Sequence, residues 1–318
     1  MSRKVLIVAP VHKVLIDRME ALGYTCVLGE EIGRPEALAT IGQYEGLVTS
    51  TRLQVDREFI DRATLLKWVG RMGSGMEVID VPYAREKGIA CFSSPEGNAN
   101  AVAEQALGML LALQHRIFSA HVEMQQGLWL REENRGLEIE GLTAGVIGYG
   151  HNGSAFARKL CTMDVRVLAL DKYKKGFAGP GIEECRDIDR IVEEADILSF
   201  HLPLSSETRH YFNDVLLDRM KKPFVLLNLS RGTIVSQQSL HRGLKNGKIK
   251  AAALDVWEKE PVSKMTDSEK VIFDELIAMP NFIGTPHIGG YTVQALYKMS
   301  AFLAQKIVEA VGNPAFGN

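Results

Sequence analysis

The sequence has only four cysteines in 318 residues, and they stand far apart at Cys26, Cys91, Cys161 and Cys185. No two of them have the Cys-X-X-Cys spacing of a zinc site or a redox motif, and they form no disulfide framework. The sequence therefore predicts free thiols in a reducing compartment. We expect a cytoplasmic protein without a bound metal ion.

Long apolar runs and an excess of charge are also absent. No stretch reaches the roughly eighteen apolar residues that a membrane-spanning helix needs. The formal net charge is −2, from 37 Lys and Arg against 39 Asp and Glu, so no surplus of cations is present to neutralise nucleic-acid phosphates. We therefore expect neither a membrane nor a nucleic acid as a partner.

The composition that remains, 46% apolar and 24% charged, is typical of a globular chain. Chains of this length usually divide into two domains of ~100–200 residues each. The first hundred residues alternate apolar runs with amphipathic stretches, which predict helices at 12–22, 34–41, 56–62 and 80–87. The predicted strands between them are Val5–Val8, Cys26–Leu28, Gly46–Thr49, Leu66–Val69 and Ile89–Phe92. This alternation predicts a parallel sheet covered on both faces.

A second α/β series follows a long apolar helix predicted over Ala99–Leu113. That helix has almost no polar face, so we expect it to be buried, either in its own domain or in a subunit interface. The predicted strands of this series are Leu142–Ile147, Val165–Leu170, Ile197–His201, Phe224–Asn228, Ala251–Asp255 and Phe282–Gly284. One more helix, about Val293–Val311, closes the pattern. The sequence thus predicts an α/β fold with two parallel-sheet domains.

A glycine-rich turn follows the first strand of the second series and precedes a helical stretch. It reads Gly148-Tyr149-Gly150-His151-Asn152-Gly153, a G-X-G-X-X-G motif. Gly148 permits a tight turn, Gly150 lets the backbone approach a pyrophosphate, and Gly153 lets the helix pack closely on the strand. The free N–H groups at the helix N-terminus then face the anion.

An acidic residue supports the same interpretation. Asp171 closes the next strand, 18 residues after Gly153 (171 − 153), where a carboxylate binds a ribose 2′-hydroxyl. The motif and this carboxylate together predict a dinucleotide site. We favour NAD over NADP because Asp171 repels a 2′-phosphate, although three cations that follow it favour the opposite choice: Lys172, Lys174 and Lys175.

Three further polar residues follow strands of the second series: Arg231, Glu260 and His287. Each alone has a simpler explanation, namely a turn arginine, a loop carboxylate and a structural histidine. Ligands bind beyond the carboxyl ends of strands in open α/β sheets, so we expect these three to converge. Reduction of a 2-oxo acid needs a cation for the carboxylate, a proton donor for the new hydroxyl, and a counter-charge for that donor.

These segments resemble the D-isomer-specific 2-hydroxyacid dehydrogenase family through nearly the whole chain, with some likeness to phosphoglycerate dehydrogenase-like members. The motifs that support the resemblance are Arg71-Met-Gly73-Ser-Gly75, Gly97-Asn98 leading to Val102-Ala-Glu104, the Gly148–Gly153 loop, His201-Leu-Pro203-Leu, and the three strand-end segments. Several independent motifs in the right order make it specific.

The resemblance implies a role for each matching residue. Arg231 would bind the substrate carboxylate and carbonyl, as suits a fork of donors. His287 would be the general acid in reduction and the base in oxidation, paired with Glu260. Asp255 would lie near the nicotinamide, and the backbone of Ser74 and Gly75 would meet the carboxylate. The expected cofactor-binding residues are Gly148, Tyr149, Gly150, His151, Asn152, Gly153, Asp171, His201, Pro203 and Asp255.

The resemblance also implies an organisation. A substrate-binding domain of residues 1–98 and 288–318 would be interrupted by an NAD-binding Rossmann domain of residues 99–287. The expected partner is a small D-2-hydroxy or 2-oxo acid, with D-3-phosphoglycerate, glyoxylate and hydroxypyruvate as candidates. We also expect a homodimer, with Ala99–Leu113 in its interface.

Departures from the family pattern leave the natural acid open. The chain has Glu77-Val78-Ile79-Asp80 where Asp-Asn-Ile-Asp is common, and Ser236 where an acid or amide is usual. Two other functions remain as alternatives: an NAD-sensing corepressor of the same fold and a phosphite-type dehydrogenase. The lack of a long disordered tail counts against the first. Glu260 is evidence against a formate-type enzyme, because enzymes of that type have Gln at this position.

Overall fold

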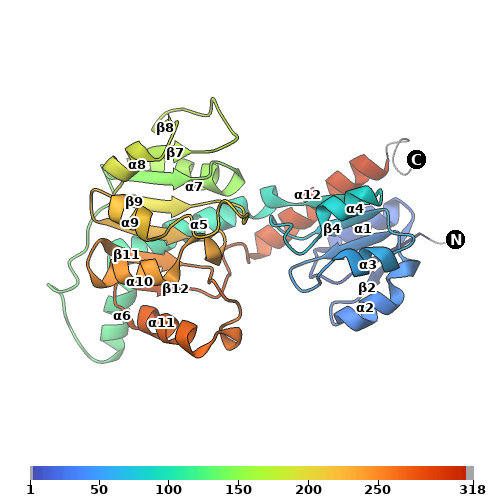
Figure 1. Ribbon diagram of the computed structural model, residues 1–318, viewed down its shortest axis with the longest axis horizontal. Helices are drawn as coiled ribbons and strands as arrows, with labels where there is room; N and C mark the ends of the chain where they lie inside the picture. The colour runs from blue at the N-terminus through green and yellow to red at the C-terminus, as the bar shows by residue number, and fades with distance from the viewer. Residues whose placement is uncertain (1–2, 313–318) are drawn as a thin grey trace. The chain divides into compact units, whose positions relative to one another are not determined.

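The computed structural model describes residues 3–312, which form two compact units. One unit joins the residues up to Ala99 with those from Gly290 onward, and the other is Asn100–Gly289. Figure 1 shows that each is a sheet with helices packed against it. Helix α5 (Pro95–Gln114) begins in the first unit and continues in the second.

The first unit has a five-stranded parallel sheet in the order β2-β1-β3-β4-β5. Its strands are β1 (Arg3–Ile7), β2 (Tyr24–Leu28), β3 (Gly46–Thr49), β4 (Trp68–Arg71) and β5 (Ala90–Ser93). Its helices are α1 (Lys13–Ala21), α2 (Arg34–Thr40), α3 (Arg57–Arg62), α4 (Val81–Glu86), α12 (Val293–Val311) and the 3₁₀ turn η1 (Ile41–Gln43).

Both faces of this sheet are covered, because side chains alternate along each strand. Val5 and Ile7 pack with residues of α1 and α12, such as Leu15 and Leu303. Leu6, between them, belongs to the opposite cluster with residues of α2, α3 and α4. The almost wholly apolar strands predicted this two-sided burial.

The second unit has a seven-stranded parallel sheet in the order β12-β11-β10-β9-β6-β7-β8. Its strands are β6 (Thr143–Ile147), β7 (Arg166–Leu170), β8 (Ile182–Cys185), β9 (Ile197–Phe200), β10 (Phe224–Asn228), β11 (Ile249–Leu254) and β12 (Phe282–Gly284). Its helices are α6 (Ile117–Gln125), α7 (His151–Cys161), α8 (Asp189–Glu194), α9 (Asp214–Arg219), α10 (Gln237–Lys245) and α11 (Asp267–Ala278), with 3₁₀ turns η2 (Gly232–Ile234) and η3 (Val262–Lys264).

The strand order places a switch point between β6 and β9. The chain runs outward from β6 to β7 and β8, then returns to pair β9 with the other side of β6. Ligands of open α/β sheets bind at such a point, beyond the carboxyl ends of the strands. The glycine turn follows β6 and His201 follows β9, so sequence-distant segments meet there.

Two elements of the second unit were not predicted. Strand β8 has two partly exposed glutamates in its centre, so it lacks the apolar run that identified the other strands. Helix α6 has no side-chain cap, and Arg116 before it has a φ of 55°. The long apolar helix also starts earlier than predicted, at Pro95.

Three further findings concern membrane-spanning helices, metal sites and the cysteines. No described helix is both long enough and apolar enough to cross a membrane. Within residues 3–312, no group of three or more His, Cys, Asp or Glu side chains is placed to hold a metal ion. The four cysteines are free thiols.

Candidate active site

The glycine turn between β6 and α7 has no room for side chains at two positions. Gly148 has a φ of 94°, and a Cβ on it would lie 2.5 Å from the carbonyl oxygen of His201. A Cβ on Gly153 would lie 1.9 Å from the carbonyl oxygen of Gly148. At Gly150, by contrast, a Cβ would meet no heavy atom within 4 Å. The backbone at the start of α7 therefore borders open space, as the approach of a pyrophosphate requires.

Asp171, just after β7, is bonded to the same turn. Its Oδ2 accepts the N–H of Tyr149 at 2.7 Å, and its Oδ1 accepts those of Tyr173 at 2.9 Å and Lys174 at 2.8 Å. Burial by itself raises the pKa of Asp171, but these three donors and the Lys174 charge outweigh it, so the pKa lies below its ordinary value. The carboxylate is thus ionised and has acceptor capacity left for a ribose hydroxyl.

His201 lies beside Gly148 and is uncharged near neutral pH. Burial lowers the pKa of its imidazole to about 4. Its Nε2 is 2.9 Å from Ser199 Oγ. Its Nδ1 and the Oδ1 of Asn152 are buried without a hydrogen-bond partner among the described residues, so both can bond a polar ligand. Together with the glycine turn, these residues fit a dinucleotide.

Arg231 follows β10 in a turn that Asn228 organises. Asn228 is fully buried at the end of β10, and its Nδ2 donates to the Arg231 carbonyl at 2.9 Å. Its Oδ1 accepts from the Ser230 N–H at 3.1 Å and the Ser230 hydroxyl at 2.7 Å. The Arg231 Nη1 donates to the Ser230 carbonyl at 2.7 Å. Both the turn and one edge of the guanidinium are therefore held in place.

Glu260 and His287 form a hydrogen-bonded pair, with 2.8 Å between Glu260 Oε2 and His287 Nδ1. The other carboxylate oxygen accepts the Trp257 N–H at 2.8 Å. Burial by itself raises the pKa of Glu260, but the His287 and Trp257 bonds and the charges of His287 and Arg231 hold it below its ordinary value. The Glu260 carboxylate is therefore ionised and can stabilise an imidazolium.

The family is decided by the NAD-binding half of the chain. A family model described as the NAD-binding domain of D-isomer-specific 2-hydroxyacid dehydrogenases matches residues 107–289, more than half of the sequence. The chain belongs to this family. The glycine turn of this dehydrogenase-family chain is accordingly part of an NAD-binding domain.

Relatives match along most of the chain. A D-3-phosphoglycerate dehydrogenase of Methanocaldococcus jannaschii is 33% identical over 306 residues, which are 96% of this chain and 56% of that protein. The chain thus spans about half the length of this relative. A hydroxypyruvate reductase of Thermotoga maritima is 33% identical over 286 residues, 90% of this chain and 91% of that one. A solved structure from Thermus thermophilus has a TM-score of 0.84, 28% identity and 99% coverage of both chains.

In this dehydrogenase-family chain, Asp255 anchors the turn that contains His287. It is buried at the end of β11, and it accepts the N–H groups of Ile288 at 2.9 Å and Gly289 at 2.7 Å. Gln105 Nε2 at 2.9 Å and the Thr285 hydroxyl also donate to it. The resemblance implied a place near the nicotinamide, which stays a prediction; the structure shows that Asp255 holds the backbone just after His287.

Two further predicted site residues lie in the first unit. Ser74 and Gly75 follow β4, beyond the carboxyl end of that strand, where a bend begins at Met72 and ends at Ser74. Gly73 has a φ of 128°, and the Ser94 hydroxyl accepts its N–H at 3.3 Å. The backbone at Ser74 and Gly75 thus has the loop setting of a ligand-binding segment.

Sequence reasoning missed two residues of the site. Asn228 is the single polar residue at the end of the strand Phe-Val-Leu-Leu-Asn, a signal that was available but not used. Gln105 lies in an otherwise apolar helix, 150 residues from Asp255, and no local pattern links the two.

Pro203, a predicted cofactor-binding residue, is exposed, and its carbonyl accepts the Thr208 hydroxyl at 2.7 Å.

Proposed function

We propose that this chain is an NAD-dependent oxidoreductase that transfers a hydride between NAD(H) and a small D-2-hydroxy or 2-oxo acid. The observation that supports this most directly is the Glu260–His287 pair, because a histidine with an ionised carboxylate on one ring nitrogen can shuttle a proton with the other. Arg231 lies at the end of the neighbouring strand β10 and adds the cation that a carboxylate substrate needs.

In the reducing direction, bound NADH supplies the hydride to C2 of the oxo acid. The guanidinium of Arg231 binds the substrate carboxylate and polarises the carbonyl. Because Nδ1 of His287 is engaged with Glu260, its Nε2–H is the group that protonates the developing alkoxide. The proton leaves imidazolium and the product is a hydroxyl; oxidation reverses the transfer.

For the substrate, we propose an unphosphorylated acid of the hydroxypyruvate or glyoxylate type. Four cations could meet a substrate phosphate, Lys13, Arg52, Arg131 and Arg135, and three of them have partners within the chain. Lys13 pairs with Asp17, Arg52 donates to the Glu30 carbonyl at 2.7 Å, and Arg135 donates to Glu132 at 2.5 Å.

A substrate panel tests the proposal. Purified protein with NADH should reduce hydroxypyruvate or glyoxylate with a higher kcat/KM than phosphohydroxypyruvate. A His287→Gln variant, which has no ionisable ring, should lose at least about 100-fold in kcat, the usual contribution of a general acid. If the wild type oxidises no NADH with any acid of the panel, the proposed function is wrong.

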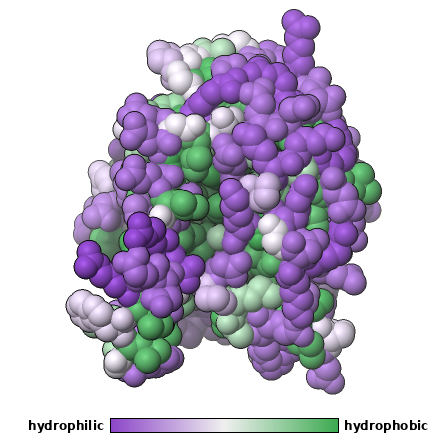
Figure 2. All heavy atoms as spheres, turned by 90° about the vertical axis from the view of Figure 1, so that its left-hand side faces the viewer, coloured by the Kyte–Doolittle hydropathy of each residue, from purple (hydrophilic) through white to green (hydrophobic). Residues whose placement is uncertain are grey.

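We also propose a homodimer, with an interface different from the one expected. Leu110 of α5 is fully buried within this chain, so this residue is not available to a partner subunit. Six large exposed apolar residues lie close together in sequence, on α6 and the segment after it: Ile117, Phe118, Met124, Leu128, Trp129 and Leu137. Figure 2 shows apolar residues among hydrophilic ones on the face it presents. Apolar patches of this kind mark interfaces.

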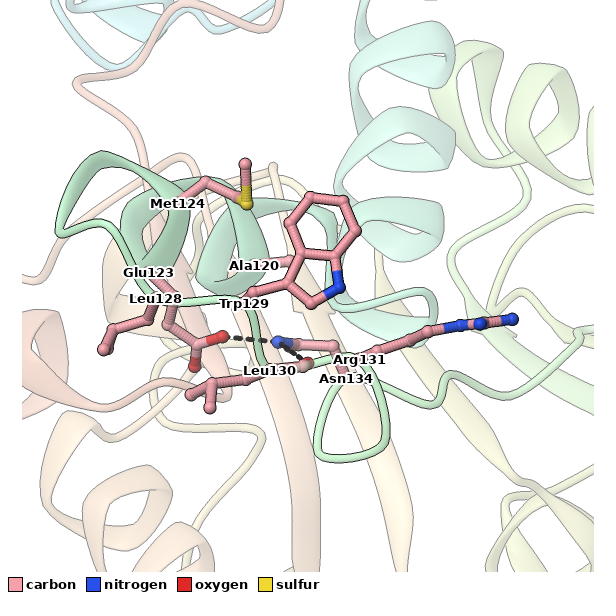
Figure 3. A pocket seen from close by; sticks show the side chains of 8 residues that line it. All are labelled: Ala120, Glu123, Met124, Leu128, Trp129, Leu130, Arg131 and Asn134. Carbon is pink, nitrogen blue, oxygen red and sulfur yellow. Dashed lines mark hydrogen bonds between the residues drawn. The ribbon is translucent and has the colours of Figure 1, made fainter.

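Hydrogen bonds hold the segment around Trp129 in place, as a preformed dimer interface requires. Its side chain is 78% exposed, yet the segment is held by Asn134, which donates to Glu123 and to the Leu130 carbonyl at 2.9 Å. Figure 3 shows the indole beside Met124. Both residues line a hollow of about 300 Å³. Sedimentation should give a dimer for the wild type and a monomer for a Phe118→Asp, Trp129→Asp variant. Val215→Asp, at another exposed apolar side chain, should remain a dimer.

We place the protein in the cytoplasm. The four free cysteines support a reducing compartment, and burial raises the pKa of the Cys26 and Cys91 thiols to about 11, which makes them unreactive.

A further inference from the structure

A second histidine–glutamate pair lies close to the first in the Asn100–Gly289 unit. His210 Nε2 and Glu258 Oε2 are 2.8 Å apart, and their side chains are 40% and 23% exposed. His210 is in the loop after β9, and Glu258 is in the loop after β11, two residues before Glu260. One short loop therefore supplies the carboxylate of both pairs.

The two pairs are built alike. The second oxygen of Glu258 accepts the Gln237 N–H at 2.7 Å, as that of Glu260 accepts the Trp257 N–H at 2.8 Å. Both histidines have a left-handed backbone, with φ of 48° at His210 and 58° at His287. Such a φ is uncommon for a residue other than glycine and persists where the surroundings impose it.

His210 is also bonded to the turn that contains Arg231. Its N–H donates to the Thr233 carbonyl at 2.6 Å, and Thr233 lies two residues after Arg231. Between them, Gly232 packs on the Glu258 loop so closely that a Cβ would lie 1.9 Å from the Trp257 carbonyl oxygen. The contacts form a closed ring: from His210 to Thr233, from Gly232 to Trp257, and from Glu258 back to His210.

We infer that His210 is a positioning residue, which with Glu258 holds the Arg231 turn and the Glu260 loop in register. The inference rests on the proposed function, which makes Arg231 the carboxylate ligand and Glu260 the partner of the proton donor. The ring of contacts joins the loops after β9, β10 and β11, three neighbouring strands. Without the His210–Glu258 bond, the Glu260 loop keeps its contact at Gly232 and the bond from Gln237 but loses its side-chain bond to the loop after β9.

His210→Asn is the decisive variant. Asn tolerates a left-handed backbone, so the turn is kept, but its shorter side chain does not reach Glu258. We expect kcat for the 2-oxo acid to fall on the order of 10-fold and its KM to rise, because small misplacements of binding groups have effects up to about 100-fold. The KM for NADH should stay unchanged. His210→Gln, whose amide nitrogen can take the place of Nε2, should restore most of the loss.

The matched control is His241→Asn. His241 Nε2 is 2.6 Å from Glu275 Oε2, but this pair joins two helices, α10 and α11, and no loop that follows a strand. It should alter none of these kinetic constants. Glu258→Gln should reproduce His210→Asn, and the double variant should show no added loss, since the two residues act as one unit. Equal effects of His210→Asn and His241→Asn, or additive losses in the double variant, would overturn the inference.

A measurement without substrate separates this inference from the proposed function. In spectra of protein labelled with ¹³C-histidine, His210→Asn should move the ring signals of His287, and His241→Asn should not. If the wild type reduces no acid, the proposed function fails while this comparison still reports on positioning. If the wild type is active and the His287 signals do not respond to His210→Asn, the positioning role is refuted and the proposed function stands.

Discussion

Glu260→Gln tests how the carboxylate controls the protonation of His287. Because the folded pKa of Glu260 lies below its ordinary value, about 4.3 in a peptide, the carboxylate is ionised at neutral and mildly acid pH. The stabilising contribution of the ionised Glu260 carboxylate is fully present at a pH above its ordinary pKa. It is lost as the pH falls through the lower pKa of the folded state. Gln keeps the shape but removes the charge at every pH.

The magnitude follows from the geometry. A hydrogen bond to a charged group contributes about 1.5–3 kcal/mol. The side chains of His287 and Glu260 are 44% and 36% exposed, so solvent screens the pair. A discounted value of about 1 kcal/mol corresponds to about 0.7 of a pH unit. Reduction needs the imidazolium, so in Glu260→Gln it should be lost at a pH lower than in the wild type by this amount. Oxidation needs the neutral ring, so in the variant it should extend toward acid pH by the same amount.

The assay is the pH dependence of kcat/KM in both directions. Glu275→Gln, which removes the carboxylate beside His241, is the control and should shift neither profile. The two profiles must move in the same direction, which a general loss of activity does not produce. If Glu260→Gln lowers both rates uniformly and shifts neither profile, the carboxylate does not set the charge of His287 and the reasoning is refuted.

Three further predictions concern the cofactor and the substrate. Asp171→Ser should weaken the preference for NADH over NADPH, measured as a ratio of kcat/KM values; a wild type that prefers NADPH would contradict the role of Asp171. Gly153→Ala should weaken NADH binding in a fluorescence titration, since its Cβ would collide with the Gly148 carbonyl, whereas Gly179→Ala, with open space around it, should not. Arg231→Lys should raise KM and lower kcat for the acid, because Lys keeps the charge but loses the two-pronged geometry; unchanged kinetics would remove Arg231 from the site.

The sequence predicted those parts of the fold in which burial is two-sided. The strands Gly46–Thr49, Phe224–Asn228 and Phe282–Gly284 were predicted with the bounds that the structure shows. Strand β8 was not predicted, because it is an edge strand that mixes apolar and acidic residues, Ile-Glu-Glu-Cys. The start of α5 was not predicted either, because Gly97 in its first turn is a poor helix former, although Pro95 at the first position is a common helix start.

The candidate site divides in the same way. The glycine turn and Asp171 lie within one strand–turn–helix–strand unit, so their spacing along the chain predicts their proximity. The long-range bonds have no such signal. Gln105 and Asp255 are 150 residues apart, and His210 and Glu258 are 48 apart. Only the strand order, which sequence reasoning did not predict, brings such residues to one edge of the sheet.

The backbone at His287 shows why Asp255 belongs with this site. A left-handed φ at a residue other than glycine costs about 1–3 kcal/mol, and glycine would remove that cost but also the imidazole. Asp255 accepts the N–H groups of the next two residues, and each hydrogen bond to a charged acceptor contributes about 1.5–3 kcal/mol. These bonds offset the strain and fix the turn at which Nδ1 of His287 meets Glu260. The histidine therefore keeps a conformation that it would not adopt alone, and the buried carboxylate holds the turn on which the proposed proton donor stands.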